Sequence, residues 1–237
     1  MDCMSSGEGR ELKVRMYPQS MLEFERCQPV SEGRYNEARF LSGFVQECTE
    51  GRTVFDIGAH IGTFTLFAAQ AVGPTGKVYA FEMDPLNYRS LGINIARNKL
   101  TNVTAINKAV SSCSGVAHYT RPSEESGDGA PSISTGADAT HQAEMVSIDQ
   151  LIGQGVVGIP DVAKIDVEGH EMEVVKGMKG TLLNHCVMLF IEVHDRLLQK
   201  NGESEVSFTV LLQSLGYGRR DDLTKEGRTE KHLVFSR

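Results

Sequence analysis

Short apolar runs alternate with amphipathic segments along most of the chain. The apolar runs predict strands, and the segments between them carry apolar residues at helical spacing. Strands are expected at 53–58, 77–82, 102–110, 161–169, 187–193 and 231–236, and helices at 63–72, 85–100, 171–185 and 205–216. Strands that alternate with helices of this length are joined as parallel strands by right-handed crossovers. The pattern therefore predicts a doubly wound α/β fold.

Two regions depart from this alternation. Residues 1–33 are polar and irregular, and the helical spacing of Phe40, Leu41 and Phe44 follows them, so residues 1–50 are expected to form a helical or irregular cap segment. Between 111 and 147, two strand-like runs flank a stretch rich in Ser, Gly and Ala. This stretch predicts a β-hairpin insertion, which either covers a site or is a plain loop. Residues 51–237 are then one domain.

Composition narrows the class of protein. The chain has 237 residues, of which 40% are hydrophobic, so it can bury one sizeable core. Its formal net charge of −7 disfavours a nucleic-acid partner, because such binders usually present a basic face to phosphates. Five scattered cysteines without a C-x-x-C motif predict reduced thiols and a cytoplasmic location. No signal peptide and no apolar run of about 18 residues is found, so no membrane span is expected. The oligomeric state is open, a homodimer included.

The first candidate motif is the glycine turn in "VFDIGAHIGTFTL", residues 54–66. Gly58, Ala59 and Gly62 let the backbone approach a ligand, although strand-to-helix turns also use glycine for packing alone. The next strand ends at Glu82, whose carboxylate can accept both hydroxyls of a ribose. No G-x-G-x-x-G and no Walker lysine is present, which disfavours NAD and ATP. Asp56, before the turn, suits the ammonium group of a methionine moiety, so S-adenosylmethionine (SAM) is favoured over a dinucleotide.

An acidic cluster is expected at the ends of two later strands. Asp166 and Glu168 lie two residues apart after one strand, and Glu192 and His194 lie two apart at the end of the next. If these strands are neighbours, the four side chains meet at the carboxyl edge of the sheet, where open α/β sheets bind ligands.

This cluster suits methyl transfer to a hydroxyl, which needs alignment and removal of a proton. His194 has the unperturbed pKa best placed for a base, Glu168 or Glu192 would orient it or act as the base, and Asp166 would contact the charged end of SAM. The cluster could instead hold Mg²⁺ or Ca²⁺, but His194 is a poor ligand for hard cations, so no metal is expected. His170 and Glu171 are expected to be solvated in a first helical turn.

Four blocks of the sequence resemble the FkbM-type family of SAM-dependent methyltransferases. They are "FDIGAHIGTFTL", "YAFEMDP", "NKAVSS" and "KIDVEGHEMEVVKG", and the similarity extends over residues 34–215. The resemblance implies a Rossmann-like class I fold, a seven-stranded, mostly parallel sheet whose last strand is antiparallel. His60 stands where the family often has asparagine, and it is interpreted as tolerated variation. The SAM-binding residues that the resemblance implies are Asp56, Gly58, Ala59 and Gly62 for methionine and ribose, Glu82 for ribose, and Asn107, Lys108 and Ala109 near the adenine. Met83 and Asp166 are also expected to bind the cofactor.

The expected function is SAM-dependent O-methylation of a small molecule, sugar or glycan. Methylation of RNA or protein is the alternative enzymatic hypothesis, disfavoured by the acidic balance and the absence of an Asn/Asp-Pro-Pro-Tyr block. A non-catalytic nucleoside-binding protein of the same fold is the third.

Overall fold

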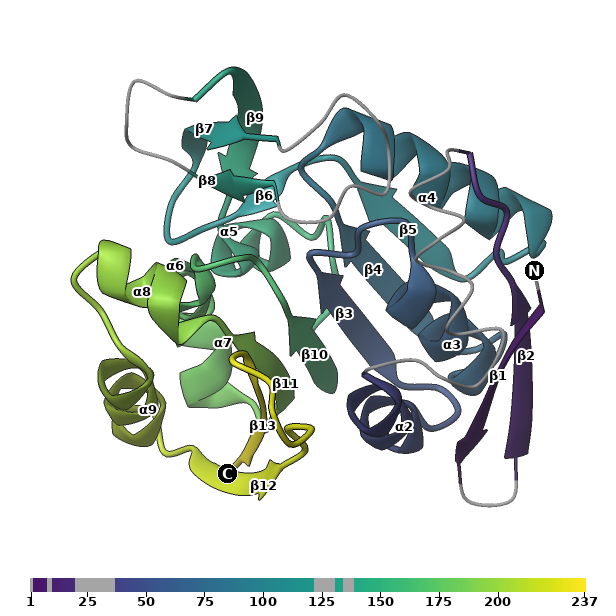
Figure 1. The fold of residues 1–237 in the computed structure, drawn as a ribbon. Coiled ribbons are helices and arrows are strands. Elements are labelled where there is room, and N and C mark those ends of the chain that lie inside the picture. The colour runs from purple at the N-terminus through teal and green to yellow at the C-terminus, as the bar shows by residue number, and fades with distance from the viewer. Residues whose placement is uncertain (1, 8–9, 20–36, 122–130, 134–138) are drawn as a thin grey trace.

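The computed structural model describes residues 2–7, 10–19, 37–121, 131–133 and 139–237 (Figure 1). Within these residues, seven strands form a main sheet in the order β12-β13-β11-β10-β3-β4-β5. In chain order, its strands are β3 Thr53–Ile57, β4 Lys77–Phe81, β5 Val103–Ile106, β10 Val162–Ile165, β11 Met188–Val193, β12 Gly218–Asp222 and β13 Lys231–Ser236.

The main sheet has the predicted topology. Strands β3, β4, β5, β10 and β11 pair in parallel, whereas β13 is antiparallel to both β11 and β12. The α/β prediction with an antiparallel last strand is therefore confirmed. The helices are α2 Ala38–Glu47, α3 Thr63–Ala71, α4 Pro85–Arg97, α5 Ile148–Gly153, α6 Glu171–Gly177, α7 Lys179–Asn184, α8 Asp195–Lys200 and α9 Glu205–Ser214.

The two faces of the main sheet bury separate hydrophobic clusters. Successive side chains of a strand point to opposite faces, and in β11 Phe190 belongs to one cluster while Leu189 and Ile191 belong to the other. Helices α2 and α3 cover the Phe190 face, and α5, α6, α7 and α9 cover the opposite face. Layers on both faces leave the carboxyl ends of the parallel strands as the open edge.

The N-terminal segment differs from its expected irregular form. Strands β1 Asp2–Gly7 and β2 Arg10–Arg15 form an antiparallel pair that lies against α2 and α3. Val14 and Met16 join the cluster beneath those helices. Six-residue strands with so few apolar positions give little periodic signal, and packing on the helices stabilises them. Residues 20–36 lie outside the described residues, and the division into a 1–50 cap and a 51–237 domain stays a prediction.

The insertion contains more strands than a hairpin. The expected pairing of β7 Gly115–Thr120 with β9 His141–Val146 is present, and β6 Ala109–Val110 and β8 Ser132–Ile133 complete, among the described residues, a four-stranded sheet in the order β6-β9-β7-β8. The insertion sheet lies beside the open edge of the main sheet (Figure 1). Of the stretch between the two expected strands, residues 121–142, residues 122–130 and 134–138 lie outside the described residues.

Two expected elements are each divided. The strand expected at 102–110 separates at Asn107 and Lys108 into β5 and β6, which belong to different sheets. The helix expected at 171–185 separates at Met178 into α6 and α7. A Cβ on Gly177 would lie 2.0 Å from the carbonyl oxygen of Ser111, so this close approach needs glycine. Helices α5 and α8 and strand β12 were not predicted. In the part of the chain described here, we find no helix with the length and apolar character of a membrane span.

Candidate active site

The turn after β3 has a backbone that few residues other than glycine adopt. Gly58 has φ of +80°, and a Cβ there would lie 1.8 Å from the carbonyl oxygen of Asp166. The N–H groups of Gly58 and Ala59 both donate to the carbonyl of Phe81, at 3.0 and 2.9 Å. Gly58 and Ala59 line a cavity of about 340 Å³ at the carboxyl ends of β3, β4, β10 and β11. A cavity of this size is within the usual range for small-molecule sites.

Glu82, the residue after β4, is buried at the wall of this cavity. Its Oε2 accepts the N–H of His60 at 2.7 Å, and its Oε1 accepts the N–H of Asp84 at 2.8 Å. Burial raises the pKa of Glu82 to about 7, against the lowering effect of the two backbone donors. A carboxylate has about four acceptor sites, so these two bonds leave capacity for the hydroxyls of a ribose.

Asp56 lies behind the cavity wall. Its side chain is fully buried, and its Oδ2 accepts a hydrogen bond from Thr65 Oγ1 at 2.6 Å. Its Oδ1 is 3.4 Å from the Nζ of Lys164, a buried lysine in β10 that also donates to the carbonyl of Gly58 at 2.9 Å. Burial raises the pKa of Asp56, while the nearby Lys164 opposes that rise. Asp56 thus forms an ion pair with Lys164, and the hydrogen bond from Lys164 to the carbonyl of Gly58 links β10 to the glycine turn.

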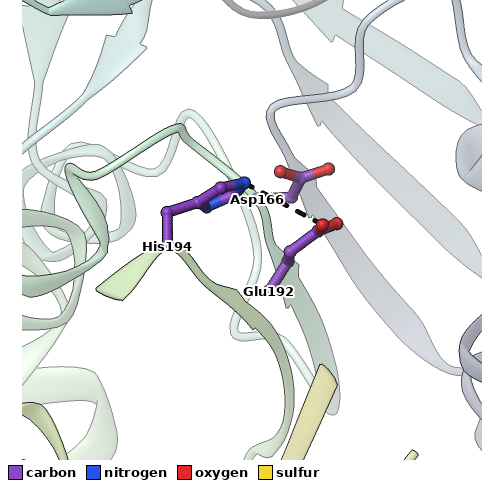
Figure 2. Close-up of side chains that lie close together, drawn as sticks. All are labelled: Asp166, Glu192 and His194. Atoms are coloured by element: carbon purple, nitrogen blue, oxygen red, sulfur yellow. Dashed lines mark ion pairs between the residues drawn. The ribbon is translucent and has the colours of Figure 1, made fainter. Parts of the chain in front are cut away.

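The four predicted acidic-edge residues do come together. Figure 2 shows the side chains of Asp166, which follows β10, Glu192 of β11 and His194, which follows β11, close together. Their ligand atoms lie within 4.8 Å of one another. His194 Nε2 is 3.9 Å from Glu192 Oε1 and 3.2 Å from Glu168 Oε2. Parallel pairing of β10 with β11 produces this convergence, as expected from the sequence.

Glu171 is the residue of this cluster that the sequence analysis misplaced. It was expected to be solvated, but it is fully buried in the first turn of α6. Its Oε1 accepts the N–H of Gly169 at 3.0 Å and lies 2.7 Å from His194 Nδ1. His170 also differs from the expectation, because it lines the cavity with its Nε2 2.9 Å from Ser111 Oγ. The helical-turn pattern gave no sign of these contacts, which depend on β11 and β6.

Surrounding carboxylates change the titration of this edge. Burial alone would lower the pKa of His194, but the hydrogen bond to Glu171 and the charges of Asp166 and Glu168 raise it to about 10. Burial raises the pKa of Glu168 to about 7, although the nearby His194 acts in the opposite direction. Burial also raises the pKa of Glu192, and the Asp166 charge adds to the rise. For Asp166, burial is outweighed by Lys164 and His194, and its pKa is lowered.

Basic side chains of the protein already lie against these carboxylates. Lys164 Nζ is 3.2 Å from Asp166 Oδ2, Arg228 Nη2 is 3.2 Å from Glu192 Oε1, and His232 Nε2 is 3.3 Å from Glu192 Oε2. The spacing of Asp166, Glu192 and His194 would suit a metal ion, but a divalent cation would have to share carboxylates with these groups. The expectation of no metal stays a prediction.

The structure divides the predicted cofactor residues into two groups. Asp56, Gly62 and Asn107 are not among the residues that line the described cavity. A Cβ on Gly62 would lie 2.7 Å from Leu91 Cδ1, so this glycine permits packing against α4. Asn107 Nδ2 donates to the carbonyls of Glu82 and Met83. The predicted residues that do line the cavity are Gly58, Ala59, Glu82, Met83, Lys108, Ala109 and Asp166.

A sequence model of the methyltransferase FkbM domain matches residues 56–218. The chain belongs to the FkbM methyltransferase family. The match covers both the glycine turn and the acidic edge, and it confirms the resemblance seen in the four sequence blocks. The hexuronic acid methyltransferase AglP of Haloferax volcanii is 32% identical over 181 residues, which are 76% of this chain and 70% of that protein.

Solved structures agree on the fold. A methyltransferase FkbM structure from Methylobacillus flagellatus aligns with a TM-score of 0.57 and 17% identity, over 80% of this chain and 44% of that one. The present chain therefore spans less than half of that structure. A SAM-dependent methyltransferase from Aquifex aeolicus aligns with a TM-score of 0.53 and 14% identity, over 93% and 98% of the two chains. This FkbM chain is a SAM-dependent methyltransferase with a class I fold.

The cavity is compatible with SAM on structural grounds. At Gly58 the backbone reaches the cavity without a side chain, since a Cβ would meet Asp166. Glu82 places a buried carboxylate at the same wall, where a ribose diol would find an acceptor. The carboxylates of the acidic edge line the same cavity and suit the positive charge of a sulfonium.

Proposed function

We propose that this FkbM methyltransferase transfers the SAM methyl group to a hydroxyl oxygen of an uncharged small molecule, sugar or glycan. The observation that carries the proposal is the cluster of Asp166, Glu168, Glu192 and His194 at the cavity. SAM, when bound, supplies an electrophilic methyl group. The protein then has to align the acceptor oxygen and take up its proton, which a cluster of carboxylates around an imidazole is equipped to do.

The cofactor half of the cavity is assigned to residues that follow β3 and β4 and to residues at the junction of β5 and β6. Gly58 and Ala59 would receive the methionine part of SAM, Glu82 and Met83 the ribose, and Lys108 with Ala109 the adenine. The residues behind the wall act indirectly. Asp56 positions Lys164, Gly62 allows α4 to approach, and Asn107 holds the backbone of Glu82 and Met83.

The charges around the acceptor half favour an uncharged acceptor. Among the described residues that line the cavity, Lys108, Lys164 and Arg228 are each ion-paired with protein carboxylates: Glu144 for Lys108, Asp56 and Asp166 for Lys164, and Glu37, Glu192 and Glu230 for Arg228. The fourth basic group at this edge, His194, is likewise paired with Glu168 and Glu171. A carboxylate acceptor would therefore meet Glu168 and Glu192 beside cations that already have carboxylate partners, and it would need no base. The name of AglP, a hexuronic acid methyltransferase, supports a sugar-sized acceptor. We infer that this chain prefers a neutral sugar hydroxyl.

A competition assay tests this function. Methyl transfer from labelled SAM is measured with matched hexosides and hexuronates, and the position of the label is determined after mild alkaline hydrolysis, which removes methyl esters but leaves ethers. We expect alkali-stable label on the neutral sugars. Label that is confined to hexuronates and lost in alkali would refute the proposal.

Two controls separate the other hypotheses. Transfer to RNA or protein at low salt would support the alternative acceptors. Calorimetric SAM binding without transfer to any acceptor would support a non-catalytic nucleoside-binding protein. The cytoplasmic location and the oligomeric state stay predictions.

A further inference from the structure

Glu168 lies on a strained turn that aims it at the cavity. Its φ is +51°, in the left-handed region that L-residues other than asparagine and aspartate seldom adopt. The next residue, Gly169, has φ of +90°, and a Cβ there would lie 2.5 Å from Leu197 Cβ. The turn is therefore held by its packing against α8. Strain that the surrounding structure maintains is concentrated at functional sites, and Glu168 lines the cavity.

His194 is held differently. Its side chain is 8% exposed, and both ring nitrogens face carboxylates, Nδ1 toward Glu171 and Nε2 toward Glu168. Glu171 is fully buried and is held in turn by the N–H of Gly169. A ring between two carboxylates keeps both of its protons, because each N–H then has an acceptor. Such a ring donates hydrogen bonds and has no lone pair with which to take a proton.

We propose that Glu168 is the general base that takes up the hydroxyl proton of the methyl acceptor. Glu171 is a positioning residue that keeps His194 as a cationic partner of Glu168. This inference rests on the proposed function. It reverses the roles expected from unperturbed pKa values, in which His194 is the base and Glu168 orients it. In the reaction, the acceptor oxygen forms a bond to the methyl carbon as the carbon–sulfur bond of SAM breaks, and the hydroxyl proton passes to a carboxylate oxygen of Glu168. The sulfonium loses its charge, and Glu168 becomes a neutral acid.

The electrostatic surroundings agree with these roles. The pKa of Glu168 is about 7, near the pH at which a general base works best, whereas the pKa of His194 is about 10. Several elements supply the charges that act on this pair. They are Asp166 after β10, Glu171 in α6 and Glu192 in β11. Around them, Lys164 in β10 lies against Asp166, and Arg228, between β12 and β13, and His232 in β13 lie against Glu192.

The test compares the pH–rate profiles of single variants. For the wild type, we expect kcat to rise with pH around a midpoint near 7. Glu168→Gln should lower kcat by about 100-fold or more and remove this rise. His194→Asn should retain activity at high pH and move the rise to higher pH, because Glu168 loses its cationic partner. If His194 were the base, the outcomes would be exchanged: His194→Asn would abolish turnover, and Glu168→Gln would move the rise to lower pH.

Glu171 is tested without an acceptor. In the free protein, the His194 ring is followed by NMR as a function of pH. We expect Glu171→Gln to lower the titration midpoint of the His194 ring from about 10 by at least one unit. The same variant should also displace the pH–rate profile. An unchanged ring titration would overturn the positioning role. Glu168→Asn replaces Glu168→Gln if the latter fails to fold, since asparagine tolerates the left-handed backbone.

The outcomes distinguish this inference from the proposed function. Wild-type transfer to a sugar hydroxyl together with full activity of Glu168→Gln would overturn the inference alone. Failure of the wild type to methylate any hydroxyl, with SAM binding intact, would overturn both.

Discussion

Replacing Glu168 with asparagine should stabilise the protein while abolishing methyl transfer. Two costs in the folded state are removed together. The first is the left-handed backbone at φ of +51°, which costs an ordinary L-residue about 1–2 kcal/mol and asparagine less. The second is the charge of a carboxylate in an unfavourable position.

The charge contribution follows from the pKa of Glu168, which is raised from 4.5 to about 7 because of burial. A shift of this size corresponds to about 3 kcal/mol, and screening at a side chain that is 28% exposed reduces it to about 1–2 kcal/mol. Since the folded protein holds this proton more tightly than the unfolded chain, the ionised form is the one that costs stability. The wild-type free energy of unfolding therefore loses this amount as pH rises from 4.5 to 7.

Urea unfolding at two pH values separates the two costs. At pH 5, we expect Glu168→Asn to raise the free energy of unfolding by up to about 1 kcal/mol, from the backbone alone. At pH 8, we expect about 2–3 kcal/mol, because the charge contribution is added. Lys99→Asn is the matched control. Lys99 is exposed and has φ of +56°, so this change should give a similar backbone gain at both pH values and leave methyl transfer unchanged.

The reasoning would be refuted if Glu168→Asn were less stable than the wild type at pH 8. It would also be refuted if the gain were the same at both pH values, which would leave only the backbone contribution.

Three further predictions concern the cofactor wall and the insertion. Gly58→Ala should lower the free energy of unfolding by about 3 kcal/mol or more and weaken SAM binding, because the added Cβ would meet the backbone carbonyl of Asp166. The control is Gly92→Ala in α4, where a Cβ would have nothing within 4 Å; in the same urea titration it should be neutral or stabilising by about 0.5–1 kcal/mol. SAM affinity in calorimetry should fall below pH 7 as Glu82, with its pKa of about 7, takes up a proton, and an affinity unchanged between pH 6 and 8 would argue against Glu82 as the ribose acceptor. Arg121→Met should lower the free energy of unfolding by about 3–5 kcal/mol, because it removes the buried ion pair of 2.7 Å between Arg121 Nε and Asp84 Oδ2. Stability within about 1 kcal/mol of the wild type would show that this pair does not anchor the insertion.

The sequence by itself determined the fold class of the protein and the order of its main strands and helices. Alternating strands and helices predicted the parallel sheet, because periodicity and burial on both faces are local properties that a sequence displays. The positions of the candidate site residues followed from the ends of the predicted strands, since parallel strands bring their carboxyl ends to one edge of the sheet. Thus Glu82, Asp166, Glu192 and His194 could be placed at the cavity from their positions alone.

The tertiary structure decided what those residues are able to do. Glu171 looks like a solvated residue in a first helical turn, but β11 buries it against His194, 23 positions further along the chain. Lys164 reads as an interruption in an apolar strand, whereas its ammonium joins Asp56, Asp166 and the carbonyl of Gly58. A pKa depends on the charges and the solvent around a group, and folding assembles these from distant segments. For this reason the sequence places the proposed base at the acidic edge, and only the assembled edge distinguishes Glu168 from His194.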